Sequence, residues 1–274
     1  MMRGAIYGFI VGDALGVPYE FKKRGTFECT GMAEYGTWKQ PKGTWSDDTS
    51  MMLATMDSLK KCGKIDVVDM RTRFSSWLYE NKYTANGDVF DVGNTTAEAL
   101  RLKRGICDVN ANGNGSLMRI LPLAFTECSE QQVARVSAIT HAHEISKIGC
   151  RIYVMIAKRL LAGENIGAIL TNTAALHDGP YKRIKDIQKL NESDIRSSGY
   201  VVDTLEAALW CIVTSGGYKE TVLKAVNLGG DTDTIAAIAG GLAGIIYGYD
   251  SIPEKWIDEI RNKSLINNIL ESAV

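Results

Sequence analysis

Apolar residues recur at intervals of three and four positions along most of the chain, whereas the strict alternation of a half-buried strand hardly occurs. This periodicity predicts an all-α protein. No Pro/Ser-rich linker, low-complexity tract or repeat of fixed period interrupts the pattern, so we predict one compact multi-helix domain over residues 1–274. The longer segments that carry the pattern are 2–20, 44–63, 129–143, 144–163, 164–177, 181–190, 202–217, 219–230 and 253–274.

Capping residues mark where several of these helices begin and end. Ser46 or Asp47 is suited to the N-cap of the second helix, and Gly63 stands just past its end. Ser129 and Gln132 have the spacing of a capping box. We therefore expect helices that start at these polar residues.

Small residues distinguish the first helix. Gly4, Gly8 and Gly12 fall on one helical face, which permits close approach of a neighbouring backbone. Pro18 is expected to end this helix, and Pro253 to occupy the first position of the last one. The glycines within 229–244 predict tight packing of a second helix, because each costs roughly 1 kcal/mol relative to alanine in a helix.

The charge balance excludes some classes of partner. The 31 basic and 32 acidic residues give a net charge of −1, which provides no overall field toward nucleic acid or an anionic membrane. The apolar run 235–248 is too short and glycine-rich to span a bilayer, and the N-terminus does not have the pattern of a signal peptide. Six scattered cysteines lack zinc-ligand spacing. These features predict a cytoplasmic protein with reduced thiols and no membrane partner.

Two short stretches place acids and hydroxyls together at expected helix starts: SDDT at 46–49 and DTDT at 231–234. Helix N-termini favour such residues for capping alone. A cap needs only one acceptor, however, and adjacent carboxylates repel unless cations or protons intervene. Mg²⁺ prefers carboxylate and hydroxyl oxygens. Whether the two stretches meet depends on the tertiary fold, so the sequence by itself leaves both interpretations open.

Four stretches resemble, in order and context, the ADP-ribosylglycohydrolase family, which includes dinitrogenase reductase-activating glycohydrolase. They are GDALGVPYE at 12–20, GTWSDDTSM at 43–51, NGNGSLMR at 112–119 and NLGGDTDTIAAIAGGLAG at 227–244. The resemblance extends from about Gly4 to Gly248. It implies a bundle of many helices in which the two acidic stretches converge on a centre of two Mg²⁺ or Mn²⁺ ions. The ligands that it implies are Ser46, Asp47, Asp48, Asp231, Asp233 and Thr234.

The chain departs from the family pattern at one of these positions. The family usually has threonine before its first pair of aspartates, and this chain has Ser46. The hydroxyl is kept, while the β-branch that stiffens the side chain is lost. We expect a looser ligand at this position and retained activity.

The resemblance implies a role for Glu20 in catalysis, and Asp47, Asp48 or Asp233 could accept the proton of a metal-activated water. The residues themselves allow Glu20 to be a simple surface acid. In the family pattern the matching glutamate lies over the metals, and Asp13 of the same motif supports the site from behind the ligands.

The stretch NGNGSLMR has the composition of a phosphate loop, since its glycines let the backbone approach an anion and Ser116 is expected to open a helix. A plain turn is the alternative. The resemblance implies that the loop contacts the diphosphate of ADP-ribose, with Arg119 in a structural role. The implied contacts are Gly113, Asn114, Gly115, Ser116 and Met118.

Two further side chains are candidates for substrate contacts. His141 and His143 make a poor metal site by themselves, and both are suited to hydrogen bonding with loop backbone; the resemblance implies that His141 lines the ADP-ribose pocket. Asp88 and Asp91 lie in a glycine-containing loop, where solvated acids are common. Such acids would suit a guanidinium group. In the members of the resembled family that cleave ADP-ribosyl-arginine, an acidic loop of this placement is implicated in substrate selection, so the resemblance makes Asp91 a hint at arginine rather than serine as the acceptor.

The function implied by these features is metal-dependent hydrolysis of the bond between C1″ of ADP-ribose and an acceptor, with an ADP-ribosylated protein as substrate and a monomeric enzyme. Protein ADP-ribosyl-arginine is the first expectation. ADP-ribosyl-serine, O-acetyl-ADP-ribose and ADP-ribosylated nucleic acid are alternatives. A non-catalytic ADP-ribose-binding pseudoenzyme and a helical interaction module are alternatives from other classes, and the full set of expected metal ligands argues against both.

Overall fold

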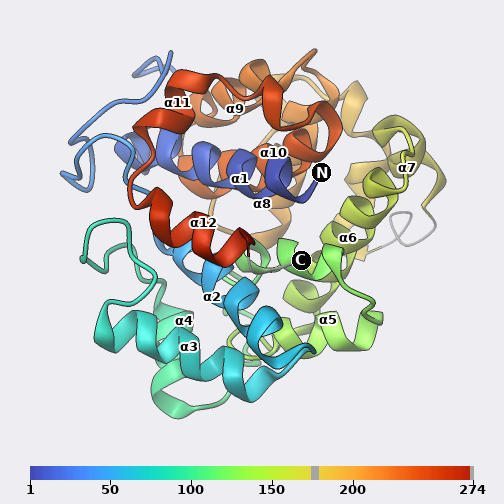
Figure 1. The fold of residues 1–274 in the computed structure, drawn as a ribbon. Coiled ribbons are helices and arrows are strands. Elements are labelled where there is room, and N and C mark those ends of the chain that lie inside the picture. Colours follow the sequence, from blue (N-terminus) through green and yellow to red (C-terminus); the bar gives the residue numbers. More distant parts are fainter. Residues whose placement is uncertain (174–178, 272–274) are drawn as a thin grey trace.

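Helices α1 (Met2–Gly16) and α10 (Thr232–Tyr247) pack against each other at the centre of the fold (Figure 1). A Cβ atom added at Gly4 would collide with the carbonyl of Gly244, and one added at Gly8 would collide with the carbonyl of Gly240. The glycines thus permit direct backbone contact between the two helices. The predicted close approach at Gly4, Gly8 and Gly12 is confirmed, and α10 is the neighbour.

The structure is a computed structural model that describes residues 1–173 and 179–271. Helices build it throughout, and the described residues contain no β-strand beyond three isolated bridges. The expectation of an all-α fold is therefore confirmed. The remaining α-helices are α2 (Asp47–Cys62), α3 (Val67–Glu80), α4 (Asn94–Leu102), α5 (Glu130–Ser137), α6 (Glu144–Leu161), α7 (Ile166–Asn172), α8 (Val201–Val213), α9 (Tyr218–Asn227), α11 (Glu254–Glu259) and α12 (Lys263–Glu271).

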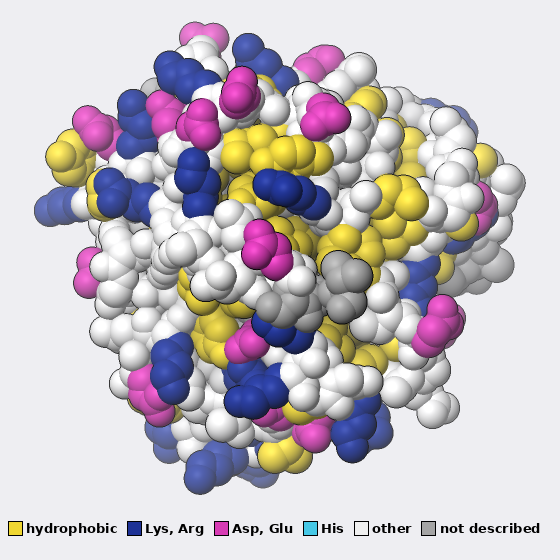
Figure 2. Space-filling view, in the orientation of Figure 1, with side chains coloured by type: hydrophobic (Ala, Val, Ile, Leu, Met, Phe, Trp, Pro, Cys, Tyr) yellow, Lys and Arg dark blue, Asp and Glu magenta, His cyan; other side chains and the backbone are white. Residues whose placement is uncertain are grey.

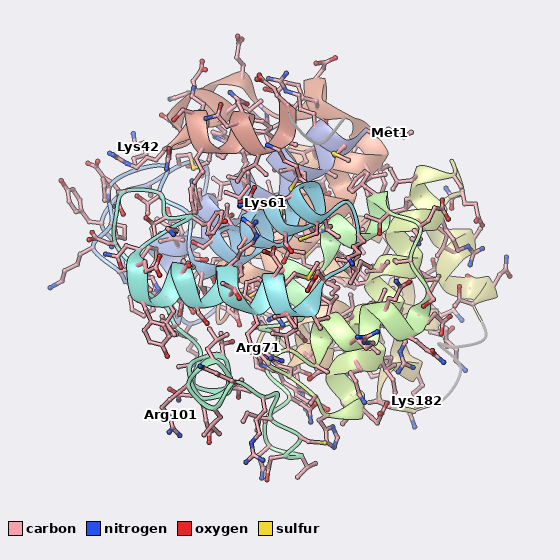
Figure 3. The ribbon with its side chains drawn as sticks, turned by 60° about the horizontal axis from the view of Figure 1, so that its bottom comes forward. Met1, Lys42, Lys61, Arg71, Arg101 and Lys182 are labelled. Atoms are coloured by element: carbon pink, nitrogen blue, oxygen red, sulfur yellow. The ribbon has the colours of Figure 1, made fainter. Side chains whose placement is uncertain are left out.

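Other helices surround the central pair. Helices α8 and α9 pack against α10, while α2 contacts both central helices and carries α3 on its outer side. Figure 3 shows α3 lying across α2, with Lys61 near the end of α2 and Arg71 on α3. One hydrophobic cluster runs through all these contacts, and it includes Ile6 of α1, Met52 of α2 and Ile238 of α10. The polar N-termini of α2 and α10 therefore lie in the buried part of the molecule.

The predicted caps of α2 and α5 are confirmed. The Ser46 hydroxyl accepts a hydrogen bond from the Asp48 amide, and Gly63 ends α2 in the left-handed conformation. Ser129 and Gln132 form the capping box of α5. Helix ends that follow from local chemistry are thus read correctly from the sequence.

Three predicted helices differ from the structure. The single helix expected over 253–274 is two helices, because the chain breaks at 260–262 and Asn262 adopts a left-handed φ of 50°. Pro253 precedes the first of them as its N-cap rather than occupying its first turn. The segment 181–190 lies mostly within a 3₁₀ helix, Gly179–Lys189, instead of an α-helix. Helix α7 ends at Asn172, and positions 174–177 of the helix expected there lie outside the described residues.

The surface carries charges of both signs. Figure 2 shows lysine and arginine side chains interspersed with aspartate and glutamate on the face viewed in Figure 1. This mixture agrees with the net charge of −1. Among the helices that the structure describes, none combines the length and apolar character needed to cross a bilayer.

Candidate active site

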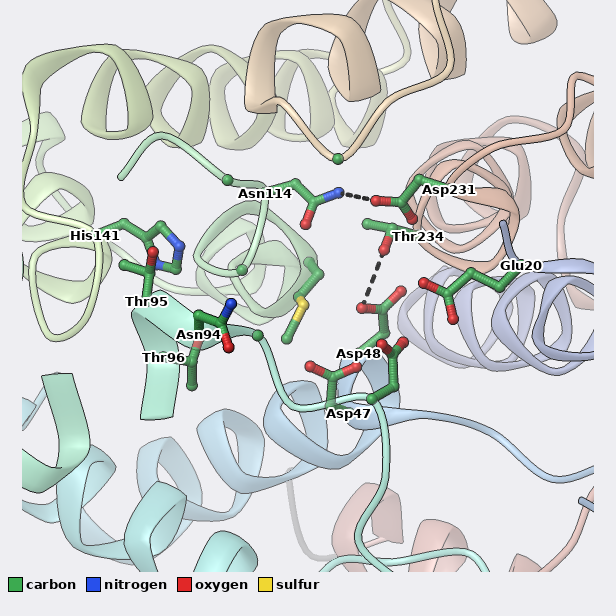
Figure 4. A pocket seen from close by; sticks show the side chains of 16 residues that line it. Glu20, Asp47, Asp48, Asn94, Thr95, Thr96, Asn114, His141, Asp231 and Thr234 are labelled. Carbon is green, nitrogen blue, oxygen red and sulfur yellow. Dashed lines mark hydrogen bonds between the residues drawn. The ribbon is translucent and has the colours of Figure 1, made fainter. Parts of the chain in front are cut away.

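A cavity lies where α2, α4 and α10 begin, beside the loop 112–116 (Figure 4). His141, Thr95 and Asn94 lie at one end of it, and Glu20, Asp47 and Asp48 lie at the other. Three helix N-termini therefore face one polar space, which favours anionic groups such as carboxylates and phosphates. The lining residues are Glu20, Asp47, Asp48, Asp91, Gly93, Asn94, Thr95, Thr96, Gly113, Asn114, Gly115, Met118, His141, Gly199, Asp231 and Thr234.

The two acidic helix starts meet at this cavity. The Thr234 hydroxyl of α10 donates a hydrogen bond to Asp48 Oδ1 of α2 at 3.4 Å, although 186 positions separate these residues along the chain. A Cβ atom on Gly16 would collide with the backbone of Asp233, so α1 fixes the start of α10 against its own C-terminal end. The convergence that the sequence left open is present in the structure.

Burial raises the pKa of Asp47, Asp48 and Asp233, and the neighbouring carboxylates raise it further. Burial also raises the pKa of Asp231. Three carboxylate oxygens in this group, Asp48 Oδ2, Asp231 Oδ1 and Asp233 Oδ2, are buried without a hydrogen-bond partner. Buried acceptors normally have partners, so their lone pairs are available for a bound cation. This donor set of carboxylates with a threonine hydroxyl fits a hard divalent ion.

A second acidic group overlaps the first. Carboxylate oxygens of Glu20, Asp91 and Asp233 lie within 4.8 Å of one another. Burial, followed by the charges of Asp91 and Asp231, raises the pKa of Glu20 to about 9. Burial first and then Asp231 raise the pKa of Asp91 to about 6. Asp91 therefore belongs to the acidic end of the cavity, whereas Asp88 of the same loop is exposed and does not line it.

Asp13 holds the start of α2 from behind. Its Oδ2 accepts hydrogen bonds from the Thr49 hydroxyl at 2.6 Å and the Thr49 amide at 3.1 Å. Its Oδ1 accepts from the Ser46 amide at 3.0 Å. The side chain is fully buried and does not line the cavity. These contacts orient the backbone that carries Asp47 and Asp48, which is consistent with the supporting role that the resemblance implies.

Asn114 connects the glycine-containing loop to the acidic helix start. Its Nδ2 donates to Asp231 Oδ2 at 2.8 Å and to the Thr204 hydroxyl at 2.9 Å (Figure 4). Its backbone N–H donates to the Gly199 carbonyl at 3.0 Å. Asn114 thus orients one carboxylate while its neighbours, Gly113 and Gly115, leave the wall of the cavity without side chains.

His141 forms the wall opposite the acids. A Cβ atom on Gly115 would lie 2.7 Å from His141 Cε1 and 3.0 Å from Thr96 Oγ1, so a side chain at this position would displace at least one of these neighbours. Burial and the nearby Arg119 guanidinium lower the pKa of His141 to about 3. The imidazole is therefore neutral at physiological pH. His143 does not reach the cavity, and its ring caps α6 by accepting from the Ile145 amide.

Three predicted site residues lie beside the cavity without lining it. Ser46 uses its hydroxyl to cap α2, and Ser116 accepts a hydrogen bond from the Ser137 hydroxyl at 2.9 Å. Asp233 does not line the cavity, but one of its carboxylate oxygens lies within 4.8 Å of those of Glu20 and Asp91. Arg119 is fully buried and donates to the Gly115 and Val136 carbonyls, a structural position as expected.

Sequence reasoning missed part of the lining. Gly93, Asn94, Thr95 and Thr96 form the beginning of α4, and a glycine followed by Asn and Thr at a helix start is a signal that could have identified them. No sequence signal points to Gly199. It lies in the loop before α8, and only the tertiary fold brings that loop to the cavity.

Comparison with known proteins agrees with this geometry. The ADP-ribosylglycohydrolase family model matches residues 2–274. The chain belongs to the ADP-ribosylglycohydrolase family. ADP-ribosylarginine hydrolase Tri1 of Serratia proteamaculans is 31% identical over an alignment covering 98% of this chain and 77% of that protein. ADP-ribosyl-[dinitrogen reductase] glycohydrolase of Rhodospirillum rubrum is 32% identical, covering 95% and 90% respectively.

A solved structure shows the same ADP-ribosylglycohydrolase fold. A chain of an ADP-ribosylglycohydrolase-related protein complex superposes with a TM-score of 0.86 at 29% identity, and the match covers 99% of this chain and 96% of that one. The bundle of many helices implied by the family resemblance is therefore confirmed.

Proposed function

We propose that this chain is a metal-dependent hydrolase that cleaves the glycosidic bond between C1″ of ADP-ribose and an arginine side chain of a modified protein. The observation that carries the proposal is the convergence of the α2 and α10 acids, with three buried carboxylate oxygens lacking partners, at one end of a cavity. Relatives named for ADP-ribosylarginine and dinitrogen reductase substrates support arginine as the acceptor.

Two divalent ions, Mg²⁺ or Mn²⁺, fit the donors at the acidic end. The carboxylates of Asp47, Asp48, Asp231 and Asp233, with the hydroxyl of Thr234, are the groups that we assign to them. Ser46 would join these ligands only by releasing the Asp48 amide, which its hydroxyl now caps. When bound, such ions neutralise the clustered acids and lower the pKa of a water molecule.

The remaining groups orient the substrate. The loop with Gly113 and Gly115 offers backbone that can approach a diphosphate, and Met118 and neutral His141 provide uncharged wall beside it. The carboxylates of Asp47, Asp48 and Asp233 are candidates to accept the proton of the attacking water. We assign Glu20, which faces Asp91, to the side on which the acceptor departs.

The chain is proposed to act as one ADP-ribosylglycohydrolase domain over residues 1–274, as a cytoplasmic monomer. The match of the family model over nearly the whole sequence supports the first point. The six cysteines are all free thiols, which supports a reducing compartment.

The test is a turnover assay on ADP-ribosyl-arginine, ADP-ribosyl-serine, O-acetyl-ADP-ribose and ADP-ribosylated nucleic acid, each with Mg²⁺, Mn²⁺ or chelator. We expect metal-dependent release of ADP-ribose from the arginine-linked substrate. Preferred cleavage of another linkage would replace the acceptor assignment. Binding of ADP-ribose in calorimetry without turnover of any of the four would identify a pseudoenzyme.

A further inference from the structure

Three aromatic side chains, Phe21, Trp38 and Phe90, are in ring contact with one another, and Trp38 is hydrogen-bonded to Glu20 at the acidic end of the cavity; they are called the aromatic rim below. The rings of Phe21 and Trp38 are 6.1 Å apart between centroids, and those of Trp38 and Phe90 are 5.6 Å apart. They come from two loops, 20–46 and 81–93, that lie on the same side of the molecule in Figure 1. The rim is thus assembled from distant parts of the chain.

The aromatic rim is separate from the hydrophobic core. Over the described residues, neither the core cluster nor the partly buried apolar side chains packed against it include any of the three. Of the five tryptophans, Trp45, Trp77, Trp210 and Trp256 are buried, and Trp38 is the exception. Phe21 is 67% exposed. Core packing therefore does not account for these aromatic side chains.

The aromatic rim is connected to the acids of the cavity. Trp38 Nε1 donates a hydrogen bond to Glu20 Oε2, while Phe21 follows Glu20 and Phe90 precedes Asp91 in the chain. Phe21 and Asp91 both adopt left-handed backbone conformations, with φ of 64° and 56°. Such conformations are costly for residues other than glycine and concentrate at functional sites. Each of the two loops therefore has one strained residue next to a residue of the aromatic rim or in it: Phe21 itself, and Asp91, which follows Phe90.

The position of the aromatic rim beside Glu20 relates it to the acceptor side of the substrate. The cavity extends from His141 at one end to Glu20 and Asp48 at the other (Figure 4). The proposed function assigns the diphosphate to the glycine loop and the scissile bond to the acidic end, which assigns the acceptor to the side of Glu20. That is the side on which Trp38 contacts Glu20, and none of the three rim residues lines the cavity itself.

We propose that the aromatic rim is the subsite for the acceptor and that it selects a guanidinium group. This inference rests on the proposed hydrolysis of an arginine linkage. A planar cation is attracted by the faces of aromatic rings, and the oxygens of Glu20 and of its neighbour Asp91 can accept hydrogen bonds from its N–H groups. An acceptor without positive charge gains neither interaction. The subsite therefore recognises the arginine side of the bond and makes no contribution to binding of ADP-ribose alone.

The test compares two constants for the variants Phe21→Leu, Phe90→Leu and the double variant. We expect KM for ADP-ribosyl-arginine to rise about three- to fivefold in each single variant and further in the double one, because a cation–π contact at an exposed site has this magnitude. The dissociation constant of ADP-ribose, measured by calorimetry with Mg²⁺, stays within about twofold of the wild-type value on the same reasoning. Tyr79→Leu, at a residue on α3 that is 62% exposed and does not line the cavity, is the matched control.

The outcomes separate this proposal from the proposed function. If the wild-type protein does not cleave the arginine-linked substrate, the proposed function fails and the subsite fails with it. If the wild type cleaves it while both variants keep its KM, the subsite alone is overturned. A parallel rise of KM and of the ADP-ribose dissociation constant also overturns it, because that result indicates a general disturbance of the cavity. A rise of KM alone, absent from Tyr79→Leu, supports it.

Discussion

Asp13 of α1 and Thr49 of α2 are joined by a buried 2.6 Å hydrogen bond from the Thr49 hydroxyl to Asp13 Oδ2. The same carboxylate receives the backbone amides of Thr49 and Ser46, so it closes the N-terminus of α2 directly behind Asp47 and Asp48. Both acids of that stretch are therefore oriented by a residue that does not touch the cavity.

The first prediction concerns this hydrogen bond. Thr49→Val keeps the side-chain shape and leaves Asp13 with one donor fewer, so we expect the free energy of unfolding to fall by about 1–3 kcal/mol. The Mg²⁺ concentration needed for half-maximal activity should rise, because the start of α2 loses its orientation. Urea denaturation and a metal titration measure the two effects. Thr72→Val, at an exposed α3 residue whose hydroxyl bonds only its own helix, is the control.

The second prediction concerns the ligands themselves. Asp231→Asn combined with Asp233→Asn should lower hydrolysis at least about a hundredfold, since even residues that only orient ligands change metal sites by 10- to 100-fold. In chelator, the variant should melt at a higher temperature than the wild type, because two buried, mutually repelling carboxylates are gone. Mg²⁺ at a hundred times its dissociation constant should stabilise only the wild type, by about 2.7 kcal/mol. Equal stabilisation of both proteins would place the metal elsewhere.

The third prediction concerns pH. Burial raises the pKa of Asp13 to about 6 and that of Glu20 to about 9, both above their unfolded values. Between the unfolded and folded values the native state holds more protons than the unfolded state, so stability falls as pH rises. Without metal, the free energy of unfolding should therefore decrease from about pH 4 to pH 9. Thermal denaturation in chelator measures this decrease, and Mg²⁺ should reduce it by neutralising the acids.

The fourth prediction concerns Gly115, where the cavity wall beside His141 has no side chain. Gly115→Ala places a methyl group 2.7 Å from His141 Cε1 and 3.0 Å from Thr96 Oγ1, so at least one of these two cavity-lining side chains has to move. We expect the dissociation constant of ADP-ribose to rise about tenfold, equivalent to 1.4 kcal/mol, in calorimetry. Gly217→Ala adds the same methyl group where nothing lies within 4 Å. Unchanged affinity in Gly115→Ala would show that the wall tolerates a side chain.

Local chemistry made much of the fold predictable. The caps at Ser46, Gly63 and Ser129 depend on a few neighbouring residues, and each was identified from the sequence. The glycines of α1 showed that a backbone approaches this helix, but their spacing contains no information about which helix does so. The break before α12 was missed because Asn262 takes a left-handed conformation within an otherwise continuous apolar pattern.

The candidate site was predictable where its residues lie in motifs and unpredictable where loops meet. The resemblance grouped the SDDT and DTDT stretches, and the structure brings them together. The contact of Trp38 with Glu20 joins two positions of one loop whose path depends on the helices below it, so no periodicity indicates it. The sequence singled out Asp91 as a candidate substrate contact. Its closeness to Glu20 and Asp233 depends on the tertiary fold, so the sequence pattern does not show it.

The backbone contact between α1 and α10 also affects when the protein becomes active during its synthesis. Asp13 and Asp47 leave the ribosome before Asp231 and Asp233, and 184 positions separate Asp47 from Asp231. Until α10 docks onto the glycines of α1, Asp47 and Asp48 lack the facing carboxylates of Asp231 and Asp233. The hydrolytic centre is therefore completed only after α10 has been synthesised and has packed against α1.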